Sequence, residues 1–170
     1  MGGAPRRPPA ARGALIELRR VIDLGVAPDA VWERLWDVPA LAACIPGCDA
    51  VEAVEAQRRY RATIRDKVGP FRIAIPLEVA VEPTPPARLV VSATGRDSVL
   101  GSPVRLRLVA TIAAGAAGGA RLSLEGHGEV GGKLAALGHG VIDRKTRDIL
   151  DRFTANLTAL FSTGSDAAAV

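Results

Sequence analysis

The chain has 170 residues, a length typical of one domain, and its 48% hydrophobic and 24% charged residues exclude an intrinsically disordered protein. The net charge of +4 is confined to the start of the chain. Residues 1–20 hold five arginines and one glutamate, and the rest carries 17 basic and 17 acidic residues. Nucleic-acid-binding domains concentrate positive charge on a folded face, so we expect no nucleic acid partner.

The first residues do not read as a targeting signal. Residues 1–13 are rich in Gly, Pro, Ala and Arg, and we expect a disordered tail there. They contain no apolar stretch of the kind found in a signal peptide. The sequence also holds no run of the roughly 20 apolar residues that span a bilayer. We therefore expect a cytoplasmic protein.

The first predicted elements are one strand and two short helices. From Ala14, apolar residues alternate through Leu24, with Arg20 as the exception on the apolar side. Pro28 and Asp29 are typical of a helix start, and Pro39 should end that helix. A second short helix is predicted from Ala40 to Cys44.

The central part of the chain predicts strands. One-sided alternation of apolar and polar residues recurs, which is typical of an antiparallel sheet with one buried face. The predicted strands cover residues 51–54, 60–64, 71–81, 89–93, 104–112 and 122–130.

The period then becomes helical from Lys133 to Phe161, with an apolar stripe that includes Ile142, Ile149 and Phe153. The predicted fold class is α+β: a curved antiparallel sheet of six to seven strands, wrapped around a long C-terminal helix. This gives one domain over residues 14–161 and a disordered tail over 162–170. Because only 4% of the residues are aromatic, we expect the sheet and helix to leave an internal cavity.

A cavity of this kind would bind an apolar molecule. The candidate lining residues are Trp32, Trp36, Ile45, Phe71, Ile73, Ile75, Leu106, Ile142, Ile149 and Phe153. The turn at residues 45–47 and the loop at Gly69 and Pro70 are candidates for a lid. The alternative is that the same side chains fill a dry core, as most apolar stripes do.

Other chemistry has weaker support. Cys44 and Cys48 lack a second pair of metal ligands nearby, so we predict no metal site. Residues 126–131 match G-x-G-x-x-G, but the helix after them leads to no second strand, so we predict no dinucleotide site. Arg20 and Asp97 are the charged residues most able to face the cavity mouth, and no catalytic residue is assigned.

Several segments together resemble a known family. They are residues 28–32, Leu35, Asp37, Leu41, residues 44–48, residues 68–71, Pro85 and Pro86, Gly95, and residues from Gly131 to Gly138. This pattern, above all the Ile-Pro-Gly element after a Val-Trp helix, resembles the CoxG family of carbon monoxide dehydrogenase proteins over residues 14–161. The resemblance implies the START-like (SRPBCC) helix-grip fold.

What the resemblance implies about function is an accessory protein of a molybdenum hydroxylase rather than a catalyst. It implies a cavity for a quinone or another lipid, no other cofactor, and peripheral contact with the inner face of the cell membrane. The alternatives are a polyketide cyclase or dehydratase that uses the same cavity, and a protein-binding adaptor with a filled core.

Overall fold

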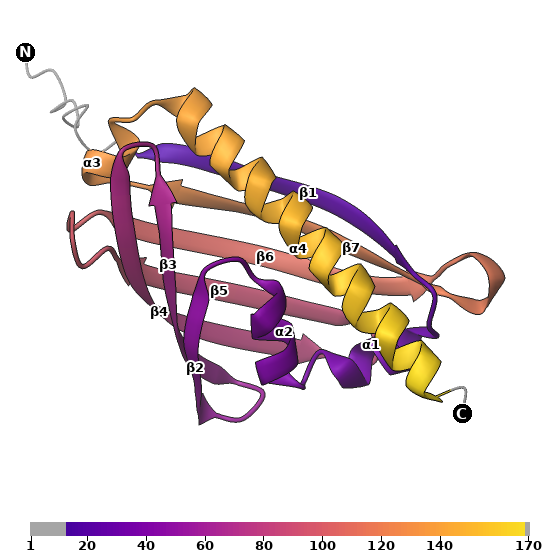
Figure 1. Cartoon of the computed structure of the whole chain (residues 1–170). Helices are drawn as coiled ribbons and strands as arrows, with labels where there is room; N and C mark the ends of the chain where they lie inside the picture. The colour runs from indigo at the N-terminus through magenta and orange to yellow at the C-terminus, as the bar shows by residue number, and fades with distance from the viewer. Residues whose placement is uncertain (1–12, 169–170) are drawn as a thin grey trace, which may run out of the picture.

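The computed structural model describes residues 13–168, in which one antiparallel sheet curves around a long helix (Figure 1). The strands are β1 (Ala14–Leu24), β2 (Cys48–Glu55), β3 (Arg59–Val68), β4 (Phe71–Thr84), β5 (Arg88–Arg96), β6 (Pro103–Ala114) and β7 (Ala120–Val130). The helices are α1 (Pro28–Arg34), α2 (Val38–Cys44), the 3-10 turn η2 (Ala116–Gly118), α3 (Gly132–Ala135) and α4 (His139–Ala168).

The sheet order is β1-β7-β6-β5-β4-β3-β2, and every neighbouring pair is antiparallel. The chain therefore winds back on itself from β2 to β7, and β7 pairs with β1. The α+β helix-grip architecture expected from the sequence is confirmed. Of the predicted tails, residues 1–12 and 169–170 lie outside the described part of the chain.

The two short helices begin and end differently from the prediction. α1 already ends at Arg34, and α2 begins at Val38, so Pro39 lies in the first turn of α2 rather than between the helices. Proline is tolerated there because the first helical N–H groups have no partner within the helix. The side chain of Asp37 accepts a hydrogen bond from the N–H of Ala40 and caps α2.

The C-terminal segment is not one helix from Lys133, as predicted, but two. α3 ends at Ala135, and Gly138 has a φ of +93°, a left-handed conformation that breaks the helix and suits glycine. α4 then starts at His139 and its backbone continues to Ala168, past the predicted end at Phe161. The break lets the chain turn from the end of β7 onto the inner face of the sheet.

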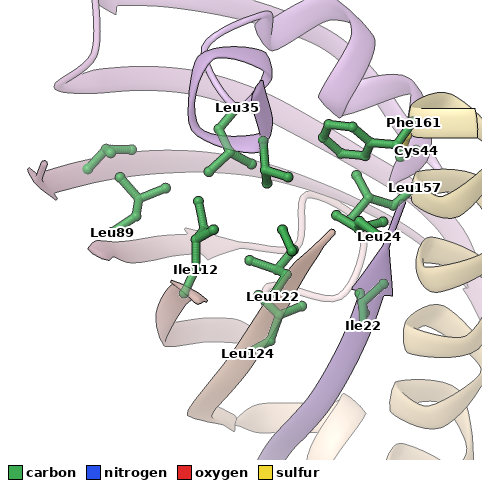
Figure 2. Packing of buried hydrophobic residues seen from close by; sticks show 14 of the residues in the cluster. Ile22, Leu24, Leu35, Cys44, Leu89, Ile112, Leu122, Leu124, Leu157 and Phe161 are labelled. Atoms are coloured by element: carbon green, nitrogen blue, oxygen red, sulfur yellow. The ribbon is translucent and has the colours of Figure 1, made fainter. Parts of the chain in front are cut away.

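The buried apolar residues form two clusters along the length of the sheet. The larger one packs α1, α2 and the C-terminal half of α4 on β1, β6 and β7, with Leu122 and Leu157 almost completely buried (Figure 2). The second cluster lies around α3 and the start of α4, where Leu134 and Ile142 meet Ile73 and Ile75 of β4.

Two ion pairs hold α4 to strands on either side of it. Arg20 of β1 lies 2.7 Å from Asp151 of α4, measured from Nη2 to Oδ1. Lys145 of α4 lies 2.8 Å from Asp66 of β3, measured from Nζ to Oδ2. Three of these side chains are largely shielded from solvent, so both pairs fix the helix more firmly than fully exposed pairs would.

Candidate functional site: an apolar cavity

An apolar cavity of about 240 Å³ lies between α2, α4 and the inner face of the sheet. Its walls are aliphatic and aromatic side chains from these two helices and from the strands β2 to β7. They include Trp36, Val38, Leu41, Ala42, Ile45, Cys48, Val51, Tyr60, Ala62, Val79, Val81, Leu89, Val91, Leu108, Ala110, Leu122, Leu124, Phe153 and Leu157, together with Leu35.

The volume is left open by small residues in places where larger ones would fill it. Ala62 of β3 and Ala110 of β6 both face inward and line the cavity, as does Ala42 of α2. Each alanine offers one methyl group where a leucine would offer a branched side chain. The space that the sheet and α4 enclose is therefore larger than their own side chains occupy.

The cavity wall carries very few polar atoms. Among the lining residues none is charged. The hydroxyl of Tyr60 accepts a hydrogen bond from the N–H of Gln57 at 2.8 Å, which occupies it in the adjacent turn. Burial raises the pKa of the Cys48 thiol, and the charge of Asp49 raises it further. Cys48 therefore stays protonated, and the surface offered to a ligand is apolar.

Cys44 is buried beside this site but points back into its own helix. Its Sγ donates to the carbonyl oxygen of Ala40 at 3.5 Å, and its own carbonyl oxygen accepts a hydrogen bond from Asn156. Desolvation raises the pKa of its thiol, against a smaller opposite effect of Arg34. Both cysteines are unpaired as disulfides.

Three of the ten candidate residues line this cavity: Trp36, Ile45 and Phe153. Trp32 packs edge-on against Trp36, with ring centroids 5.6 Å apart and an interplanar angle of 84°. Ile73, Ile75 and Ile142 belong to the second apolar cluster.

The other three candidates, Phe71, Leu106 and Ile149, are half-buried and lie outside the cavity lining. The reason for this distribution is that β4 and α4 are long enough to contribute to both clusters. Periodicity gives the face on which a side chain lies, but not its position along the sheet.

Sequence reasoning missed the lining residues of α2 other than Ile45, and the small residues of the middle strands. Val79, Val81 and Leu108 lie on the apolar side of their predicted strands but were not among the candidate cavity walls. The signal available was the alanine at positions 62 and 110 among larger inward residues. An inward alanine in a curved sheet marks a place where volume remains unfilled.

The two charged candidates have structural roles. Arg20 faces inward but pairs with Asp151 and does not line the cavity. Asp97 is buried, and its Oδ1 accepts a hydrogen bond from the N–H of Ala74 at 2.7 Å. Gly69, a lid candidate, lies against Leu137 and Val141 at the opposite end of the sheet. Within residues 13–168 no group of His, Cys, Asp or Glu side chains forms a metal cluster.

The glycines of the G-x-G-x-x-G match are explained by strand packing. A Cβ on Gly126 would lie 2.5 Å from the carbonyl oxygen of Arg107, and one on Gly128 would lie 2.6 Å from that of Arg105. Both contacts are with the backbone of β6, so the glycines permit the close approach of two bent strands.

The match to a known family covers both the cavity and the helix that closes it. The profile of the carbon monoxide dehydrogenase family CoxG matches residues 22–161. The chain belongs to the CoxG family. No curated protein sequence shows significant similarity to it.

Solved structures share the fold of this CoxG-family protein. A conserved protein from Geobacillus kaustophilus aligns with a TM-score of 0.78 at 20% identity, over 87% of this chain and 96% of that one. Protein CV1439 from Chromobacterium violaceum aligns with a TM-score of 0.59 at 22% identity, over 87% and 96%. The ZhuI aromatase/cyclase from Streptomyces sp. R1128 aligns with a TM-score of 0.61 at 13% identity, over 92% and 96%.

The most specific part of the CoxG resemblance forms one side of the cavity. Residues 28–48 make α1, α2 and the following turn, and this segment supplies Trp36, Leu41, Ile45 and Cys48 to the wall. Within the described range, no helix of this CoxG-family chain is both long and apolar enough to cross a bilayer.

Proposed function

We propose that this CoxG-family protein binds an apolar molecule, a quinone or an isoprenoid lipid, in the cavity between α2, α4 and the sheet. In this proposal it serves a molybdenum hydroxylase of the carbon monoxide dehydrogenase type as an accessory protein and aids its membrane association. The observation that carries the ligand is the uncharged cavity of about 240 Å³. Family membership supports the accessory role.

The size of the cavity favours a ring with a flexible tail. A dry apolar cavity of about 150 Å³ in another protein accepts benzene, so about 240 Å³ suits a substituted ring such as a quinone headgroup. An isoprenoid tail would then extend out of the cavity. Burial of about 200 Å² of apolar ligand surface stabilises the complex by about 5 kcal/mol before the costs of association.

A cavity-filling substitution tests the ligand site. Ala110 lines the cavity, and Ala113 lies exposed further along the same strand, so Ala110→Leu and Ala113→Leu are a matched pair. We expect decylubiquinone to raise the Tm of the wild type and of Ala113→Leu, and to leave the Tm of Ala110→Leu unchanged. A lack of any Tm shift in the wild type, with no apolar molecule in its solvent extract, contradicts the proposal.

The proposed membrane contact has a separate test. The arginines of β1 are already paired within the protein, Arg19 with Glu125 and Arg20 with Asp151. The charges that remain for anionic lipid are Arg6, Arg7 and Arg12, which lie outside the described residues. We expect the chain to sediment with phosphatidylglycerol vesicles more than with phosphatidylcholine vesicles, and replacement of these three arginines by glutamine to remove the difference. Equal sedimentation with both vesicles contradicts this part.

An aromatase or cyclase activity is the second candidate, because a structural neighbour carries that name. Acid–base chemistry needs an ionisable group within hydrogen-bond reach of the substrate. The lining offers only the hydrogen-bonded Tyr60 hydroxyl and the thiol of Cys48 as polar side chains besides the Trp36 indole N–H. The apolar wall therefore favours binding over catalysis.

A further inference from the structure

The two edge strands of the sheet differ in how well they are protected against pairing. β2, at one edge, has two register shifts in its pairing with β3, after Asp49 and after Ala53, and Ala50 has a positive φ of 45°. Such irregularities prevent the addition of another strand. β1, at the other edge, pairs with β7 over all 11 residues without a register shift and contains no proline.

The outer face of β1 also exposes apolar side chains. Leu15 and Val21 point outward and are 64% and 54% exposed, although both belong to a strand. Between them lie Glu17 and Arg19, also exposed. A long, regular edge strand with exposed apolar residues is the kind of edge that pairs with another chain.

The centre of this edge is open to solvent. A groove of about 980 Å³ is lined by residues 17–20 of β1 and, among others, by Asp143, Thr146, Arg147 and Leu150 of α4. α4 therefore forms one wall of the groove and does not close over the middle of β1. Acidic and basic side chains line both walls, so the groove suits a segment that carries both signs of charge.

We propose that two copies of the chain pair through β1, antiparallel, about a two-fold axis at Leu18. This register places Leu15 opposite Val21 of the second copy, and Glu17 opposite Arg19 of the second copy, each pair occurring twice. Directly opposite residues in antiparallel strands lie about 5 Å apart on the same face, close enough for apolar and ionic contact. Alternate residues of β1 would exchange main-chain hydrogen bonds across the axis.

The charge pattern selects this register over its neighbours. An axis at Arg19 would place that arginine opposite itself, and an axis at Glu17 would place two glutamates together. Of these three, only the axis at Leu18 brings opposite charges together and also pairs the two exposed apolar residues. In that pair Arg19 lies between Glu17 of the second copy and its own partner Glu125, which is 2.6 Å away. The strand is thus complementary to itself, which identifies a second copy as the occupant.

Charge exchange tests both the contact and its register. We expect the wild type to sediment at about 0.1 mM as a particle of twice the 17.7 kDa chain mass. Arg19→Glu creates two like-charged pairs, and we expect about tenfold weaker self-association or more. The double variant Glu17→Arg with Arg19→Glu restores opposite charges across the axis and should restore the dimer. Arg59→Glu, exposed on β3, is the control and should leave the dimer unchanged.

Cysteine cross-linking gives the register independently of affinity. A mixture of Leu15→Cys and Val21→Cys chains should form a disulfide-linked dimer under mild oxidation. Either variant alone should not, because identical positions lie about 20 Å apart in this register, six residues along the strand. Thermal unfolding of each variant at the wild-type temperature excludes misfolding as the cause of a change. A monomeric wild type, a dimer that Arg19→Glu leaves intact, a charge exchange without recovery, or equal cross-linking of single variants would each overturn the proposal.

Discussion

The side-chain amide of Asn156 donates a hydrogen bond to the main-chain carbonyl oxygen of Cys44, with nitrogen and oxygen 3.0 Å apart. The bond joins α4 to the last residue of α2. Since α2 and the residue after it supply Val38, Leu41 and Ile45 to the cavity wall, the bond holds that wall against the long helix. Opening of the cavity by movement of α2 therefore requires this bond to break.

Replacement of Asn156 should loosen α2 without harming the core. We expect Asn156→Ala to lower the free energy of unfolding by about 1 kcal/mol, because a single partly exposed hydrogen bond is lost. Amide hydrogen exchange in α2 should become faster. Thr158→Ala is the control, since Thr158 is exposed on the same helix and its hydroxyl donates only to the carbonyl of Thr154. Equal exchange rates in both variants would show that the bond does not hold α2.

Leu157 is fully buried and lines the cavity, so its truncation should both destabilise and enlarge the site. We expect Leu157→Ala to lower the free energy of unfolding by about 2 to 5 kcal/mol, from lost apolar burial and the added void. Urea denaturation measures the effect. Val99→Ala removes methyl groups from a side chain that is 65% exposed and should change stability by less than about 0.5 kcal/mol. A cost below about 1 kcal/mol at Leu157 would mean that the site collapses around the smaller residue.

The fold could be predicted well because its main signals in the sequence are local. Alternation identified the inward side of β1, and the change of period marked the passage from β7 to the helices. The break at Gly138 was missed because a glycine within a helical pattern is compatible with either continuation or termination. Only the docking of α3 on the second cluster decides between them.

The position of the cavity was harder to predict than its chemistry. Apolar walls follow from composition, but Phe153 lines the cavity and Ile142 does not, although both lie on the same stripe of α4. The difference depends on which strand residues lie beneath each of them, and those contacts join residues far apart in sequence. The role of Asp97 was equally hidden, because its partners lie on β4 and in the following loop.

Asp97 should be among the most sensitive polar residues in the protein. Its carboxylate accepts hydrogen bonds from the N–H groups of Ala74 and Leu100, and its own N–H donates to the carbonyl oxygen of Ser102 at 2.8 Å. We expect Asp97→Ala to cost about 2 to 4 kcal/mol of unfolding free energy, because two donors lose their acceptor inside the protein. Asp23→Ala removes a carboxylate from the exposed Arg121 pair and should cost less than about 1 kcal/mol. Similar losses for the two variants, in urea denaturation, would contradict a bracing role for Asp97.

The two cysteines should make the protein less stable at alkaline pH. Burial raises the pKa of both thiols above their ordinary value, so the folded chain keeps these protons at a pH where the unfolded chain releases them. Stability is therefore full below the ordinary thiol pKa and falls as the pH rises from there through the folded values. We expect Cys44→Ala with Cys48→Ala to flatten the decline in urea midpoint between about pH 8 and pH 10 relative to the wild type. An identical decline in both proteins would assign it to other groups, such as lysine and tyrosine, and would contradict the effect of the thiols.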